Sequence, residues 1–138
     1  MSTEFGDVER AAKDLLGVTV CTPVLTSDEL DERVGGAAFL KAESLQRGGA
    51  FKLRGAYTKL TSIPEHERRR GVVAVSSGNH AIAVALSAKL LGTTATILVP
   101  EDAPAAKIDV VRRLGAEIVT FDRFAEDRDA ATAALVSE

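Results

Sequence analysis

The sequence predicts an α/β fold in which a parallel, doubly wound sheet is flanked by helices. Short apolar runs alternate with helix-like stretches from Gly71 onward, as strands and crossover helices do in parallel sheets. The run Val72–Val75 is continuously apolar, which is typical of a strand covered on both faces. The chain has 138 residues, of which 46% are hydrophobic, so it is long enough to bury the core of one domain.

The first fifty residues predict short, mixed elements. Asp7 is expected to cap a helix that ends at Gly17. The β-prone stretch 18–25 follows, and Pro23 within it favours an edge strand. The remaining elements of this part are a helical turn over 28–33, a reversal at Gly35 and Gly36, and a short strand over 37–42.

The rest of the chain predicts the sheet and its helices. A helix is expected over 51–60, since Pro64 disfavours its continuation. Asp102 is expected to cap a helix that has Pro104 in its first turn. The other predicted elements are strand 72–75, helix 79–91, strand 94–99, strand 117–121 and helix 124–136. The change in composition near residue 50 predicts a boundary between residues 1–50 and residues 51–138.

Charge and composition argue against several function classes. The net charge of −3, the scarcity of aromatic residues and the absence of Trp disfavour nucleic-acid binding. The basic run 68–70 reads as a solvated helix end or as a polyanion site. A single cysteine, Cys21, excludes an internal disulfide and suits a reducing compartment. With no stretch long enough to span a bilayer and no signal-peptide pattern, we expect a cytoplasmic protein without membrane partners.

Lys52 is a candidate nucleophile because it stands where a helix is predicted to begin. Phe51 and Leu53 are apolar neighbours, and Arg54 follows two residues later. Partial burial, a nearby cation and a helix N-terminus all favour the unprotonated amine that forms Schiff bases with aldehydes. An ordinary surface lysine is the alternative interpretation.

A polar loop, residues 76–80, lies between an apolar strand and an apolar helix. In open α/β sheets, ligands bind at the carboxyl ends of strands, and the free N–H groups of a helix start bind anions. Such a loop can hold an acid, although a plain helix cap would also explain Ser77 or Asn79. No G-x-G-x-x-G or Walker-type loop supports nucleotide binding.

The two motifs together resemble the threonine dehydratase and serine racemase family. These are pyridoxal-phosphate enzymes of the tryptophan-synthase-β-like fold. Segment 45–57 (LQRGGAFKLRGAY) is similar to the lysine segment of that family, and 76–81 (SSGNHA) to its substrate and cofactor loop. Segments 99–107 and 113–117 resemble the family as well, and the resemblance extends from about Thr22 to the C-terminus.

The resemblance implies a role for each matching residue. Lys52 would form a Schiff base with pyridoxal phosphate and exchange protons with the substrate α-carbon. Phe51 would pack against the cofactor, and Asn79 would hydrogen-bond its ring hydroxyl. The substrate carboxylate would be held by Ser76, Ser77, Gly78, Asn79 and His80. In racemases of this family, the serine that matches Ser77 is a second acid/base. Residues 1–50 would belong to the larger cofactor domain, and residues 51–138 would form most of the smaller domain.

Two departures from the family pattern bear on substrate choice. Gly48, Gly49 and Ala50 stand where the family commonly has Thr-Gly-Ser, and Ile82 and Ala83 stand where it usually has Gln-Gly. By the resemblance, the glycine-rich phosphate loop and the divalent-cation ligands lie beyond residue 138, so we expect no metal site in these residues. We also expect little or no dehydratase activity from them alone, and self-association through exposed apolar surface.

The resemblance implies an ammonia-lyase that converts a small hydroxy-amino acid to a 2-keto acid and ammonia, for example in isoleucine biosynthesis. We expect the protein to be a homo-oligomer. An amino-acid racemase of the same family, a non-catalytic binding module and an unrelated α/β ligand-binding domain are the alternatives.

Overall fold

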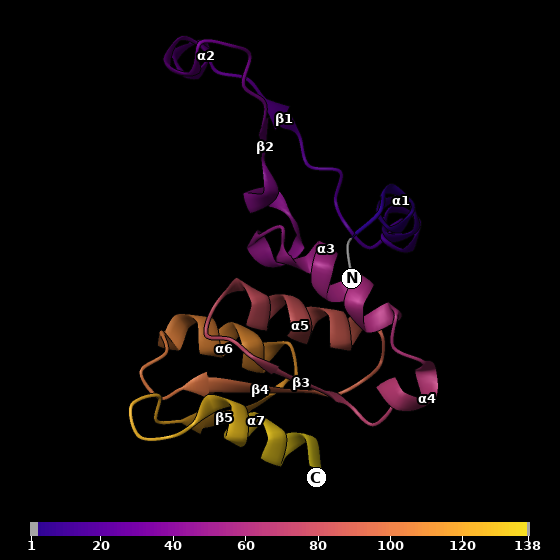
Figure 1. Ribbon diagram of the computed structural model, residues 1–138, viewed down its shortest axis with the longest axis vertical. Coiled ribbons are helices and arrows are strands. Elements are labelled where there is room, and N and C mark those ends of the chain that lie inside the picture. Colours follow the sequence, from indigo (N-terminus) through magenta and orange to yellow (C-terminus); the bar gives the residue numbers. More distant parts are fainter. Residues whose placement is uncertain (1–2, 138) are drawn as a thin grey trace.

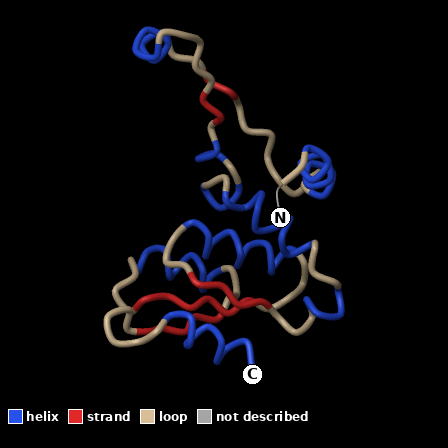
Figure 2. The backbone as a smooth tube through the Cα atoms, in the orientation of Figure 1, coloured by secondary structure: helices blue, strands red, loops and turns tan. Residues whose placement is uncertain are grey.

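A three-stranded parallel sheet with strand order β3-β4-β5 underlies the structure (Figures 1 and 2). The computed structural model describes residues 3–137. The strands are β3 (Val72–Val75), β4 (Ala95–Pro100) and β5 (Glu117–Phe121). Their register places Leu98 between Val75 and Val119. The predicted parallel α/β fold is thus confirmed, with β3 and β5 at the predicted bounds.

Helices cover both faces of this sheet. The crossover helices α5 (Asn79–Leu90) and α6 (Ala105–Arg113) lie on one face, and α7 (Arg128–Ser137) lies on the other (Figure 1). Two crossovers that run in the same direction across a sheet place their helices on the same face. Helix α7 follows β5 and covers the opposite face, so helices flank the parallel sheet on both sides, as predicted.

Helix α5 is the centre of the core. It lies between the sheet and α3 (Lys52–Thr61), so it is apolar nearly all round (Figure 1). Its buried residues are mostly small: Ala81, Ile82, Ala83, Val84, Ala85, Ser87 and Ala88. The buried Ser87 hydroxyl donates to the Ala83 carbonyl oxygen at 2.7 Å, so it adds no unpaired polar group.

Strand β3 differs from the prediction that both of its faces are covered. All four of its residues are only half-buried. The face opposite α5 and α6 is covered by α7 alone, and an open hollow runs between α4 (Glu65–Arg68), β3 and α7. A continuous apolar run therefore overstated the burial of this strand.

Three predicted helix starts are placed differently by the structure. Asp7 is the third residue of α1 (Phe5–Asp14), where it accepts a hydrogen bond from the Glu4 amide. The Asp102 carboxylate pairs with Arg123, and Pro104 itself precedes the first residue of α6. Helix α7 begins four residues later than predicted, because the Asp127 carboxylate accepts from the amides of residues 129 and 130.

The N-terminal part extends away from the sheet as an arm (Figure 1). Strands β1 (Val24–Leu25) and β2 (Leu40–Lys41) pair antiparallel, and α2 (Asp28–Val34) connects them. Both strands are exposed and shorter than predicted, because they pair only with each other among the described residues and a two-stranded ribbon is weakly stabilised. The arm also exposes large apolar side chains, among them Phe5, Leu16, Val34, Phe39 and Leu45.

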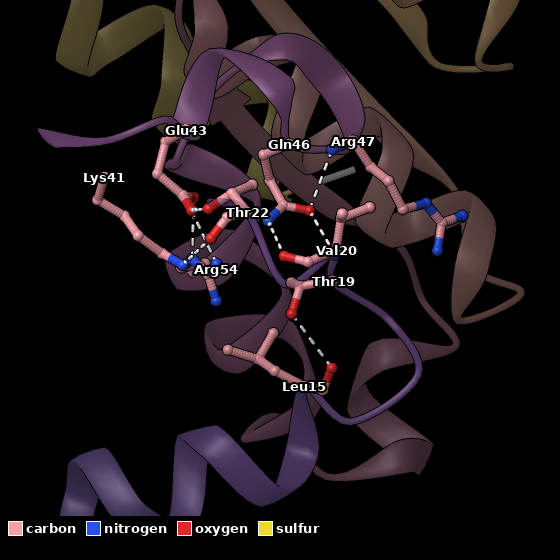
Figure 3. A network of polar contacts seen from close by, with 9 residues as sticks. All are labelled: Leu15, Thr19, Val20, Thr22, Lys41, Glu43, Gln46, Arg47 and Arg54. Carbon is pink, nitrogen blue, oxygen red and sulfur yellow. Dashed lines mark hydrogen bonds and ion pairs between the residues drawn. The ribbon is translucent and has the colours of Figure 1, made fainter. Parts of the chain in front are cut away.

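Gln46 ties the start of the arm to the segment that precedes α3 (Figure 3). Its side chain is 3% exposed and bonds both ways with Val20: Nε2 donates to the Val20 carbonyl oxygen, and Oε1 accepts from the Val20 amide, each at 2.9 Å. The same Oε1 accepts from the Arg47 amide at 3.0 Å. The Gln46 side-chain amide therefore satisfies both backbone groups of Val20, as a neighbouring strand would.

We expect Gln46→Leu to lower the free energy of unfolding by about 2 kcal/mol, because a side chain of similar size leaves these backbone groups without a partner. Urea unfolding followed by circular dichroism measures the change. Ser44→Ala, at an exposed neighbouring position, is the control and should shift stability by less than about 0.5 kcal/mol. Equal midpoints for Gln46→Leu and the control would contradict the anchoring role.

Candidate active site

The 76–80 loop connects the carboxyl end of β3 to the first residues of α5, as predicted. The Ser76 amide donates to the Leu98 carbonyl oxygen at 3.1 Å and so extends the strand pairing by one residue. The Gly78 amide donates to the Ser76 hydroxyl at 3.2 Å, which closes a tight turn. Ser76, Ser77 and Gly78 are half-buried, whereas Asn79 and His80 are exposed. The loop therefore presents polar groups at the edge of the sheet.

Lys52 is the first residue of α3, so its predicted place at a helix start is confirmed. Its side chain is exposed, and its Nζ lies 5.2 Å from the centre of the Phe51 ring, which is itself 59% exposed. Of the two apolar neighbours of Lys52, Leu53 is buried in the core and Phe51 is not. The lysine therefore lies beside an aromatic face and is not in an apolar pocket, in contrast to the partial burial that its neighbours suggested.

The lysine and the loop belong to one electrostatic environment. Helix α3 packs along α5, so the start of α3 and the 76–80 loop lie on the same side of the sheet. The pKa of His80 is lowered, first by partial desolvation of the ring and then by the nearby Lys52 ammonium. A neutral imidazole is favoured as a result, and it can both donate and accept a hydrogen bond.

Lys107 is a neighbour of the loop to which the sequence assigned no role. It lies in the first turn of α6, and its Nζ lies 3.8 Å from the position that a Cβ atom would occupy at residue 78. Gly78 has φ −130°, which any residue can adopt, so its backbone does not require glycine. The meeting of β3 and β4 at one sheet edge was the signal that could have found Lys107.

An open hollow of the described surface lies elsewhere. It has a volume of about 920 Å³ and is lined by residues of α4, β3, β5 and α7, with none of the predicted site residues among them. The chemistry of the candidate site therefore rests on the lysine and the loop and not on this open hollow.

Arg54 is engaged with a carboxylate and is not a free cation beside Lys52. Its Nε and Nη2 donate to the two Glu43 carboxylate oxygens at 2.9 and 2.8 Å, and the Thr22 hydroxyl donates to the same carboxylate at 2.6 Å (Figure 3). The Arg54 hydrogen bonds are the main cause that lowers the pKa of Glu43 to about 2. Arg54 was expected to favour the unprotonated Lys52 amine as a nearby cation, but the Glu43 carboxylate offsets its charge.

A known protein family matches most of the chain. The family described as "Pyridoxal-phosphate dependent enzyme" matches residues 16–138. The chain belongs to this family. Its cofactor is pyridoxal phosphate, as predicted, and the family resemblance stated from the sequence is confirmed.

The relatives cover more than one activity. The chain is 50% identical over 127 residues to an L-threo-3-hydroxyaspartate ammonia-lyase of Pseudomonas sp, which spans 92% of this chain and 40% of that protein. It is 47% identical over 113 residues to an L-threonine ammonia-lyase of Thermotoga maritima, covering 82% and 28%. The structure of maize serine racemase superposes with a TM-score of 0.91 at 36% identity, over 99% of this chain and 42% of that one. The chain thus spans about two-fifths of the first of these relatives.

Two further features of residues 3–137 concern metal ions and membranes. No cluster of three or more His, Cys, Asp or Glu side chains among them is arranged to hold a metal ion. None of the helices that the structure describes is long and apolar enough to cross a membrane.

The Glu43–Arg54 pair predicts a loss of stability in acid. The pKa of Glu43 is below its unfolded value, so the stabilisation is complete above about pH 4.5 and is lost as the pH falls toward 2. Near neutral pH, we expect the free energy of unfolding to be about 1–2 kcal/mol higher in wild type than in Glu43→Gln. This value allows for solvent screening, because the Arg54 side chain is 35% exposed. Urea midpoints of both proteins across this pH range measure the difference. A gap that persists unchanged at the acid end would be inconsistent with this account.

Proposed function

We propose that this chain supplies the catalytic lysine and the carboxylate-binding loop of a pyridoxal-phosphate-dependent ammonia-lyase that acts on a small hydroxy-amino acid. The observation that carries the proposal is that α3, which begins at Lys52, packs along α5, so that Lys52 and the 76–80 loop lie on the same side of the sheet. Family membership and the hydroxy-amino-acid ammonia-lyases among the relatives support it.

The residues fit the cofactor in their donor chemistry. Lys52 offers an exposed amine for an aldehyde, and Phe51 offers an exposed aromatic face beside it for a ring. Asn79 offers an amide that can hydrogen-bond a ring hydroxyl. When bound, pyridoxal phosphate supplies an electron sink for the carbanion that forms at the substrate α-carbon.

The chain's own residues would do the rest of the work. Lys52 would move a proton at the substrate α-carbon. Ser76, Ser77 and the free backbone amides of Asn79 and His80 would hold the substrate carboxylate at the start of α5, and Gly78, which has no side chain, would let it approach the backbone closely. Neutral His80 would add a hydrogen bond to this anion. Fixing the carboxylate orients the α-carbon toward Lys52, and orientation is a large part of the rate.

A serine racemase is the second candidate function. The TM-score of 0.91 with maize serine racemase supports it, and Ser77 stands in the loop where a second acid/base would act. Retention of both Lys52 and Asn79 disfavours the non-catalytic module. Five expectations stay predictions. They are the boundary at residue 50, a homo-oligomeric state, a cytoplasmic location, a place in isoleucine biosynthesis, and little or no activity of these residues alone.

We expect pyridoxal phosphate and borohydride to modify Lys52 selectively, because its exposed amine lies beside the Phe51 ring, which can pack on the cofactor, as well as on the side of the 76–80 loop. Peptide mapping by mass spectrometry, with the visible absorbance band before reduction, measures the adduct. Lys52→Ala should remove it. Lys59→Ala removes an exposed lysine of the same helix and should leave it unchanged. Labelling spread evenly over the lysines of the chain would sink the proposed function.

A further inference from the structure

The turn that leads into Lys52 is closed by an ion pair. Glu43 and Arg54 are eleven positions apart, and between them lie two 3₁₀ turns and the start of α3. Arg54 Nε donates to Glu43 Oε2 and Nη2 donates to Oε1, so the pair has the forked geometry that fixes orientation as well as distance. The segment 43–54 is therefore a closed loop with Lys52 near one end.

Glu43 is itself held in place from a second direction. Its side chain is only 15% exposed, and the buried Thr22 donates its hydroxyl to the carboxylate. The Lys41 ammonium donates to the Thr22 carbonyl oxygen, which joins the same cluster (Figure 3). The carboxylate that receives Arg54 is thus a fixed point of the arm and not a mobile surface acid.

The start of α3 has few other restraints. Phe51, which precedes the helix, makes no side-chain cap and is exposed, as is Lys52. Gly48 and Gly49, just before it, adopt positive φ values of 78° and 73°, which glycine reaches without the steric cost that other residues meet. Buried Ala50 and Leu53 hold this segment against the core, and the Arg54 fork joins its first turn to Glu43 of the arm.

We infer that Glu43 and Arg54 are positioning residues for Lys52. By holding the first turn of α3, the pair restricts the volume that the Lys52 amine explores and keeps it beside the Phe51 ring and the 76–80 loop. The inference rests on the proposed function, in which Lys52 is the reactive amine. A loss of the fork would cost selectivity at Lys52 even where the fold is kept, because small displacements of a reacting group lower rates steeply.

A purely structural tie between the arm and α3 would behave differently. It would change global stability and the reactivity of all lysines together. A positioning role changes Lys52 relative to Lys59, which lies on the same helix beyond the reach of the fork. The ratio of adduct at these two lysines therefore separates the two roles.

The test compares Glu43→Gln and Arg54→Lys with wild type in the complete 138-residue chain. Arg54→Lys keeps the charge and loses the fork, so it isolates geometry. Glu65→Gln removes the acid of the exposed Glu65–Arg69 pair and is the matched control. The first readout is the Lys52 to Lys59 adduct ratio with pyridoxal phosphate and borohydride. The second, which needs no cofactor, is amide hydrogen exchange over residues 47–53.

We expect the adduct ratio to fall roughly fivefold to tenfold in Glu43→Gln and by an intermediate amount in Arg54→Lys. Exchange over 47–53 should rise in both, with β4 unaffected and the control unchanged. An unaltered ratio and unaltered exchange in both variants would overturn the inference. Absence of any Lys52 preference in wild type would instead overturn the proposed function, and exchange would then decide alone whether the pair holds the turn.

Discussion

The close packing of α3 on α5 is the contact on which the other features depend. Small side chains along α5, such as Ala81 and Ala85, let it lie between the sheet and α3 without leaving space. This sandwich places the start of α3 and the loop after β3 on one side of the molecule. Larger residues on α5 would move the lysine away from the loop before they disturbed the sheet.

The sheet could be predicted because its signals are local. Apolar runs such as Val72–Val75 bounded by glycine or polar residues define strands directly, and Gly92 and Gly115 end the helices between them. The arm was harder to predict, since two-residue strands such as Val24–Leu25 carry almost no pattern. The start of α6 was misplaced because Asp102 pairs with Arg123, and the start of α7 because Asp127 accepts from the first amides of that helix.

The candidate site was predictable in its parts and not in its couplings. Lys52 and the 76–80 loop are readable as motifs, and their mutual placement follows from the order of strands. The Glu43–Arg54 fork joins residues eleven apart through irregular turns, and no periodicity announces it. Lys107 differs, since it reaches the loop from the crossover after the neighbouring strand β4, and strand order could have indicated it. Pairings across irregular backbone depend on the folded path and are invisible before it is known.

The one thiol of the chain offers a practical handle on this arrangement. Cys21 is exposed and free, and it lies on the arm between the two residues, Val20 and Thr22, that are tied to the segment before α3. A fluorophore attached there by maleimide chemistry would occupy a single known position. Its anisotropy would follow the docking of the arm in real time, so mixing experiments could resolve how fast the arm docks during refolding.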